Sequence, residues 1–148
     1  MGKESMGRVI AIANDHAGVT LKQALIPVAR AAGYEVLNLG TDSNDSVDYP
    51  DYGRQVGETV ARGAAQYGIA ICGSGVGISM AANRVAGARC VLGYSTEVAA
   101  LGRKHNDANI LALGQRLISE ADAIEILNTF LTTEFEGGRH EARVEKLG

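Results

Sequence analysis

The architecture of this 148-residue chain can be approached from one stretch, Gly68-Ile69-Ala70-Ile71-Cys72-Gly73-Ser74-Gly75-Val76-Gly77-Ile78-Ser79. Its apolar start predicts a buried strand, and the alternating glycines after Cys72 predict a turn in which backbone N–H groups converge on a ligand. Residues 78–84 indicate the beginning of a helix, whose N-terminus suits an anion. A thiol beside a helix N-terminus tends towards the thiolate, so Cys72 is a candidate base or nucleophile.

Each feature of this stretch also has an ordinary structural explanation. A free Cys at the end of a strand is most often a small buried hydrophobic residue, and a glycine cluster is most often a tight turn. A dinucleotide site is weakly supported, because the glycines follow the third strand as G-x-G-x-G rather than the first as G-x-G-x-x-G. Glu97 does lie near the distance expected for a ribose-binding acid.

Predicted strands and helices alternate on both sides of this stretch. The strands cover residues 8–14, 34–39, 68–71, 88–92 and 110–113, and the helices cover residues 21–29, 51–66, 78–84, 97–104 and 120–133. This alternation implies a Rossmann-like, doubly wound parallel sheet of five strands within a three-layer α/β/α sandwich. Ligands bind beyond the carboxyl ends of such strands, and in the commonest five-stranded order they bind between the first and third strands.

Composition limits the kinds of protein to which this chain can belong. Its length and 46% hydrophobic content predict a single domain, residues 1–148, with a core of its own. The net charge of −3 and the lack of a basic run argue against nucleic acid or a membrane as a partner. Residues 1–6 carry no apolar signal core, so we expect the chain to stay in the cytoplasm. Cys72 and Cys90 lie on adjacent predicted strands without a metal or disulfide pattern, so we expect both to be reduced.

Two groups of polar residues could bring chemistry to the carboxyl edge of the sheet. Asp15 and His16 close the first strand and could act as acid, base or phosphate donor, or Asp15 could simply cap the next helix. His105-Asn106-Asp107 lies between a helix and the fifth strand, and we expect it on the same edge, although a lone loop His is usually solvated. Together these residues would place two imidazoles near the thiol.

Arginines supply the candidate phosphate ligands. Arg139 and Arg143 follow the break at Gly137-Gly138, and on a helix they would share one face, a fork that suits a phosphate. Arg116, just after the fifth strand, could add a third cation. The ordinary explanation for each is a solvated side chain in a charged segment.

Taken together, these segments resemble the type B ribose-5-phosphate isomerases and the related galactose-6-phosphate and other sugar-phosphate isomerases. The resemblance covers the chain from about residue 8 to its end, and it implies an enzyme that moves a proton between C1 and C2 of a sugar phosphate through a cis-enediolate, without metal or cofactor. The matching stretches are Asn14-Asp15-His16-Ala17-Gly18, Gly40-Thr41, Asp48-Tyr49-Pro50, residues 71–79, Ala82-Asn83, His105-Asn106-Asp107-Ala108-Asn109 and Glu136-Gly137-Gly138-Arg139-His140.

The resemblance also implies a role for each site residue. Cys72 would be the base that shuttles the proton, Ser74 would assist proton transfer among the oxygens, and His105, with Asp15 nearby, would open the furanose ring. Ile78 stands where some relatives carry a Glu base, which makes this chain the cysteine type. The substrate-binding residues would be Gly73, Gly75 and Gly77 at the enediolate, Tyr49 and Asn106 at the sugar hydroxyls, and His16, Arg116, Arg139 and Arg143 at the phosphate.

In the family the site is shared across a homodimer, so the resemblance implies a homodimer or a dimer of dimers in which residues 134–148 form an arm on the partner. The segment Gly93–Val98 departs from the family pattern, and because it follows the fourth strand it could line the sugar pocket. Ribose 5-phosphate and ribulose 5-phosphate are the expected substrates. A four- or six-carbon sugar phosphate, or a phosphosugar- or nucleotide-binding module without turnover, stays open as an alternative.

Overall fold

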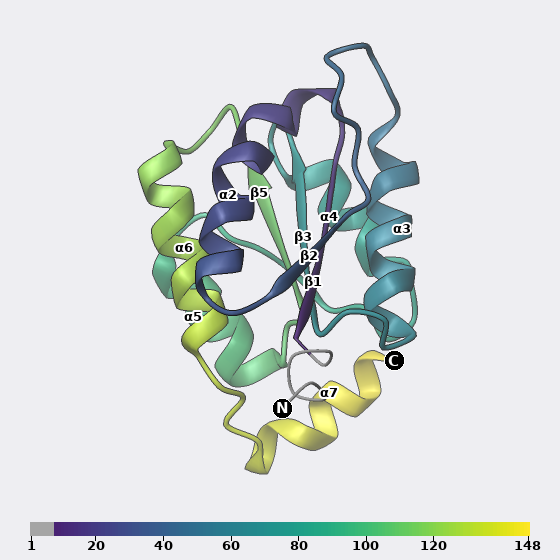
Figure 1. Ribbon diagram of the computed structural model, residues 1–148. Coiled ribbons are helices and arrows are strands. Elements are labelled where there is room, and N and C mark those ends of the chain that lie inside the picture. Colours follow the sequence, from purple (N-terminus) through teal and green to yellow (C-terminus); the bar gives the residue numbers. More distant parts are fainter. Residues whose placement is uncertain (1–7) are drawn as a thin grey trace.

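The computed structural model describes residues 8–148, which form an α/β/α sandwich around one sheet (Figure 1). The parallel strands are β1 (Val9–Asn14), β2 (Glu35–Asn38), β3 (Tyr67–Cys72), β4 (Cys90–Leu92) and β5 (Ile110–Gly114). The helices are η1 (His16–Gly18), α2 (Val19–Ala31), α3 (Tyr49–Ala61), α4 (Val76–Asn83), α5 (Thr96–Asn106), α6 (Glu120–Thr132), η2 (Gly138–His140) and α7 (Glu141–Leu147). The predicted fold class is confirmed.

The two faces of the sheet bury different side chains, because successive residues of a strand point to opposite faces. In β1, Ile10 and Ile12 pack with α2, α5 and α6, whereas Ala11 and Ala13 pack with α3 and α4. Small residues also let α3 approach α4 closely, since a Cβ on Gly53 would lie 2.6 Å from the Cβ of Ala81. This close approach brings the start of α3 over the turn that follows β3.

The strand order is β2-β1-β3-β5-β4. The first and third strands are neighbours, as predicted, but β5 lies between β3 and β4, so the expected adjacency of the strands of Cys72 and Cys90 is wrong. Burial explains the order: all of β5 is buried, whereas the three residues of β4 are only partly buried, as suits an edge strand. The loop after β5 therefore borders the turn after β3.

The element boundaries differ from the predictions at a few turns. Helix α3 begins at Tyr49 rather than Asp51 and ends at Ala61 rather than Gln66, because the chain turns at Gly63 with φ +81°. The predicted cap of α6 is confirmed, since the Ser119 side chain accepts a hydrogen bond from the Asp122 backbone N–H.

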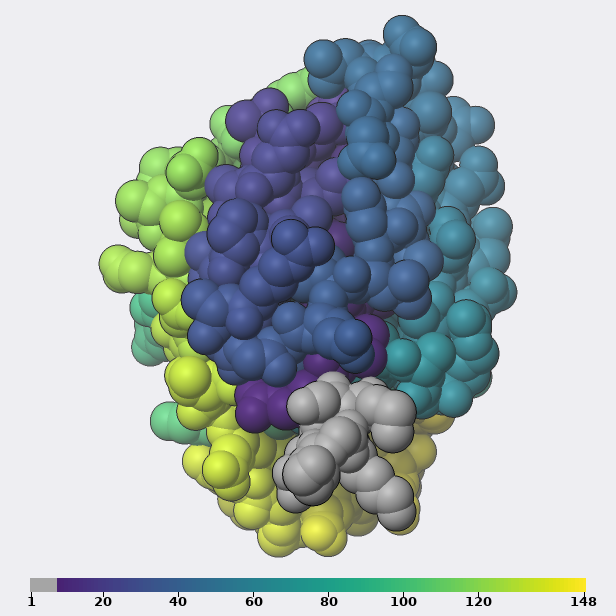
Figure 2. Space-filling model, in the orientation of Figure 1, coloured from purple at the N-terminus to yellow at the C-terminus, as the bar shows by residue number. Residues whose placement is uncertain are grey.

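The two ends of the sandwich carry different segments. The 39–48 loop lies at the carboxyl end of the strands, whereas η2 and α7, drawn in yellow, lie across the amino end (Figures 1 and 2). Within the described residues, every helix is too short or too polar to cross a lipid bilayer. Residues 1–6, on which the expectation about a signal segment rests, lie outside the described residues.

Candidate active site

A cavity of about 460 Å³ lies beyond the carboxyl ends of β1 and β3. The predicted meeting of the two strand ends is confirmed, because Asn14 pairs with Ile71 and the Asp15 backbone N–H donates to the Ile71 carbonyl oxygen at 3.1 Å. Three chain segments besides these strand ends contribute to its wall: the start of α3, the start of α4 and the turn after β5. The lining residues are Asp15, Tyr49, Cys72, Gly73, Ser74, Val76, Gly77, Met80 and Arg116.

Cys72 is a free thiol, 5% exposed, in the wall of this cavity. Its Sγ accepts a hydrogen bond from the backbone N–H of Gly75 at 3.2 Å. Gly75 has φ +80°, and a Cβ there would lie 2.9 Å from the carbonyl carbon of Leu113, so a side chain would be strained and would collide with β5. The hydrogen bond fixes the sulfur at the edge of the glycine turn, where it faces the cavity.

The turn after Cys72 is closed by side chains of the opposite wall. The Ser74 hydroxyl accepts a hydrogen bond from the Val76 N–H at 3.1 Å, which places this hydroxyl at the N-terminus of α4. A Cβ on Gly77 would lie 2.6 Å from the Tyr49 ring, and a Cβ on Gly73 would lie 2.8 Å from the Arg116 guanidinium. These two glycines therefore let an aromatic ring and a cation approach the turn.

Asp15 and His16 lie at the end of β1. The Asp15 carboxylate accepts from the Ala17 N–H at 2.9 Å, so the capping interpretation is correct, yet the same residue lines the cavity. His16 Nδ1 accepts from the Val47 N–H at 3.2 Å. In the neutral ring the proton then lies on Nε2, which is left as a donor.

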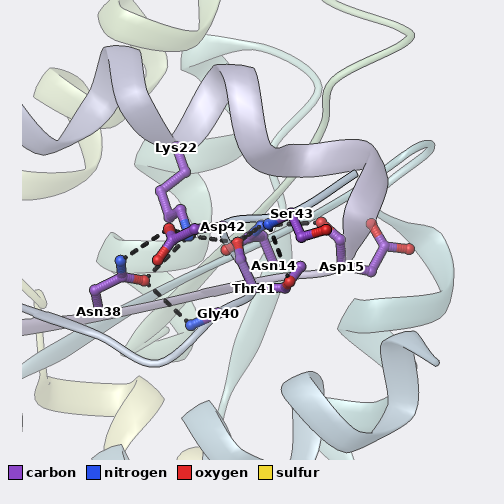
Figure 3. A network of polar contacts seen from close by, with 8 residues as sticks. All are labelled: Asn14, Asp15, Lys22, Asn38, Gly40, Thr41, Asp42 and Ser43. Carbon is purple, nitrogen blue, oxygen red and sulfur yellow. Dashed lines mark hydrogen bonds and ion pairs between the residues drawn. The ribbon is translucent and has the colours of Figure 1, made fainter. Parts of the chain in front are cut away.

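Sequence reasoning missed the polar network beside these residues, which is centred on Lys22 (Figure 3). Its ammonium group contacts Asn38, Thr41 and Asp42, and Asn14 joins the same turn. The signal was a lysine on the apolar face of a helix, three residues before Leu25 and seven before Ala29.

The expectation that His105, Asn106 and Asp107 lie at the carboxyl edge is wrong. Helix α5 runs back from the end of β4, so the loop between α5 and β5 lies at the amino ends of the strands. Asp107 is used structurally there, since its carboxylate pairs with Arg103 at 2.9 Å and with Arg89 at 3.5 Å. A segment that precedes a strand of a parallel sheet lies at the opposite edge from one that follows it.

The C-terminal segment lies at the same amino end. The Glu136 N–H donates to the Lys104 carbonyl oxygen, and the His140 ring stacks on His105 with centroids 4.5 Å apart. Arg139 and Arg143 are both exposed, but the first belongs to η2 and the second to α7, so the expected single helix is replaced by a 3-10 turn and a separate helix.

His105, Glu136 and His140 bring three atoms of metal-ligand type within 4.8 Å of one another. The two imidazole planes are inclined by only 17° in a face-to-face stack, so the nitrogen lone pairs of the two rings lie in two separate, nearly parallel planes. One ion cannot lie in both ring planes, as metal ligation by imidazole requires. The arrangement therefore serves ring packing, with His140 Nε2 3.5 Å from the Glu136 carboxylate.

The expectation that residues 93–98 could line the sugar pocket is also wrong for the cavity at Cys72. In the described chain, Tyr94, Ser95 and Thr96 line a separate hollow of about 240 Å³ against α6. The physical reason is the strand order, because β5 separates the end of β4 from the end of β3.

Known proteins resemble this chain over most of its length. Residues 10–147 match the family described as Ribose/Galactose Isomerase. Ribose-5-phosphate isomerase B of Escherichia coli is 44% identical over 138 residues, 93% of each chain. The structure of ribose-5-phosphate isomerase B from Clostridium thermocellum matches with a TM-score of 0.92 at 48% identity, over 95% of both chains. That of Mycoplasma genitalium with bound ribulose-5-phosphate has a TM-score of 0.91 at 40% identity, over 96% of this chain and 95% of that one.

Proposed function

The chain belongs to the ribose/galactose isomerase family, and from this premise we propose how it interconverts ribose 5-phosphate and ribulose 5-phosphate. One observation carries the proposal: a free thiol, Cys72, faces a cavity and accepts an N–H from the glycine turn behind it. A base held beside a bound sugar can take a proton from one carbon and return it to the next. Aldose–ketose isomerisation requires this step.

In the proposed reaction the Cys72 thiolate removes the proton from C2 of the open-chain aldose, and the resulting thiol returns it to C1. The negative charge passes to the oxygens of the cis-enediolate, where backbone N–H groups of the turn at Gly73, Gly75 and Gly77 stabilise it. The Ser74 hydroxyl lies in the same cavity and exchanges protons between the two oxygens.

We infer that the remaining groups come from a second copy of the chain. His105 and Asn106 lie at the opposite end of the sheet from Cys72. Every residue of the seven-residue helix α7 is at least partly exposed, and a helix this short gains stability by docking on another surface. Apolar side chains are exposed at both ends, Met80 at the cavity and Leu147 on α7. In a twofold homodimer, the carboxyl end of the sheet in one subunit packs against the amino end of the sheet in the other. A dimer of dimers is compatible with this arrangement.

Within such a dimer, His105 of one subunit and Asp15 of the other open the furanose ring, while Tyr49 and Asn106 hold the sugar hydroxyls. The phosphate is bound from both sides. His16 donates from Nε2 and Arg116 lies against the glycine turn, and the partner supplies Arg139 and Arg143 from residues 134–148. A cytoplasmic location suits this chemistry, because the catalytic thiol must stay reduced.

An activity panel tests the proposal. Purified protein is assayed against ribose 5-phosphate, erythrose 4-phosphate, allose 6-phosphate and galactose 6-phosphate, with ketose formation followed by NMR. We expect the highest kcat/KM with ribose 5-phosphate. A preference for a four- or six-carbon sugar would reassign the substrate, and phosphosugar binding without turnover of any aldose would contradict the isomerase mechanism.

A further inference from the structure

Lys22 is a charged residue that the proposed reaction does not use, and it is 1% exposed. Its ammonium group donates to the Thr41 carbonyl oxygen at 2.6 Å, to Asn38 Oδ1 at 3.2 Å and to Asp42 Oδ1 at 2.5 Å (Figure 3). A lysine ammonium has three N–H donors, and burying it is costly unless each finds a partner. Lys22 meets this condition and joins α2 to the turn at residues 40–42.

The same turn holds Asn14, the last residue of β1. The Asn14 side-chain amide donates to the Thr41 carbonyl oxygen and to the Asp15 carbonyl oxygen, both at 2.9 Å. Gly40 packs so closely that a Cβ there would lie 1.8 Å from Asn14 Oδ1. Asn14 is therefore held between the turn and the backbone of Asp15, and Lys22 holds the turn.

The loop that begins with this turn also reaches His16. Val47, near the far end of the loop, donates its N–H to His16 Nδ1, and Tyr49 then enters the cavity wall at the start of α3. The 39–48 loop thus supports both Asp15 and His16. It holds the Asn14 amide that donates to the Asp15 carbonyl oxygen, and it supplies the Val47 N–H that donates to His16. Lys22 itself is not among the residues that line the cavity in the described chain, so its influence must pass through the loop.

We propose that Lys22 is a positioning residue of the isomerase: it fixes the 40–42 turn, through which Asn14 sets the backbone of Asp15 and the loop sets the tautomer of His16. The proposal rests on the proposed function for its kinetic consequences. A displacement of about 1 Å at a reacting group can cost about a hundredfold in rate. The alternative is that Lys22 only ties α2 to β2 and contributes stability.

Three variants separate these roles. Lys22→Met keeps the stem and removes the donors, Lys22→Arg keeps the charge, and Gln23→Met changes an exposed neighbour on the same helix. Turnover of ribose 5-phosphate and solvent exchange of the C1 proton of ribulose 5-phosphate are measured well below each variant's Tm. For Lys22→Met we expect turnover to fall about tenfold to a hundredfold and KM to rise, with a smaller loss of exchange because Cys72 is untouched. Lys22→Arg restores part of the loss, and Gln23→Met behaves as wild type.

A second readout does not depend on activity. The chain has three histidines, so the ring ¹⁵N signals of His16 can be assigned by substitution. We expect wild type and Gln23→Met to show His16 protonated on Nε2, and Lys22→Met to show mixed tautomers. If Lys22→Met does not fold, Asp42→Asn removes the negative charge that the Lys22 ammonium contacts and should shift the same signals partway. A lowered Tm with unchanged kinetics and tautomer would overturn the proposal, whereas wild type without ribose 5-phosphate turnover would contradict only the proposed function.

Discussion

The carboxyl and amino ends of the same sheet are built in different ways. At the carboxyl end, Cys72 and Asp15 are buried, and each is held by a backbone N–H of its own chain. At the amino end, Arg139 and Arg143 are exposed, although the segment that carries them is anchored to the body by the buried His140, which stacks on His105. The first end is preorganised by folding, and the second offers groups that reach their position only by docking. In the proposed dimer, one subunit supplies the base together with Asp15, His16 and Arg116, and the partner adds His105, Asn106, Arg139 and Arg143.

The largest effect should come from breaking the preorganised end. Cys72→Ala removes the proposed base, so turnover should fall by about 10⁴-fold while ribulose 5-phosphate still binds in calorimetry, because the glycine turn and Arg116 remain. Iodoacetamide should inactivate the wild type, and bound substrate should slow the reaction.

The matched control for this variant is Cys90→Ala. Although Cys90 is only partly buried as a residue, desolvation of its thiol raises the pKa to about 12, so this cysteine stays protonated and should neither react nor matter for turnover. Near wild-type turnover by Cys72→Ala would show that the base lies elsewhere.

A smaller loss should follow from breaking the amino end. His105→Ala should lower turnover of cyclic ribose 5-phosphate by about 10²-fold and affect solvent exchange of the C1 proton of ribulose 5-phosphate less, because the ketose is already open-chain. Both are measured by NMR in deuterated buffer, with exposed Lys104→Ala as the neighbouring control. Equal losses in the two assays would rule out ring opening as the specific role of His105.

A mixing experiment tests directly whether the two ends meet in trans. Cys72→Ala subunits are combined in equal amounts with Arg139→Ala/Arg143→Ala subunits, and we expect each variant alone to be inactive. After random exchange, half of the dimers are heterodimers, and one of the two sites in each heterodimer is complete. Activity should therefore recover to about a quarter of wild type. Mass spectrometry checks that heterodimers form. If they form without recovery, the arginines serve their own subunit or bind no phosphate.

The smallest effect concerns the loop that supports the carboxyl end. Hydrogen bonding to Lys22 holds the pKa of Asp42 below its ordinary value of 3.8. The pKa of Asp42 is therefore lower in the folded chain than in the unfolded chain. The ion pair stabilises the fold fully at pH values above the unfolded-chain pKa, and this contribution is lost as the pH falls through the folded-chain pKa. Wild type should therefore melt slightly above Asp42→Asn at pH 7, and the two should converge in acid.

Thermal unfolding followed by circular dichroism across this pH range measures the difference, with Asp45→Asn on the same loop as the control. A difference in melting temperature between wild type and Asp42→Asn that stays constant at all pH values would show that the charge of Asp42 does not contribute to its interaction with Lys22.

Much of the molecule follows from local sequence patterns. The alternation of apolar runs with amphipathic segments predicted every strand and the layered architecture, because periodicity and turn residues act within a few positions. The strand–turn–helix at Cys72 and the acid at the end of β1 were placed correctly, because chain direction in a parallel sheet puts every strand end at one edge.

Packing over long distances decided the rest. The order of β4 and β5 depends on which strand is better buried, and this order moved residues 93–98 away from Cys72 and brought Arg116 beside it. The position of His105 follows from the direction of α5, and the partners of Lys22 come from β2 and the loop after it. Such contacts join residues far apart in sequence, so their energies are absent from any local pattern and arise only when the chain is folded.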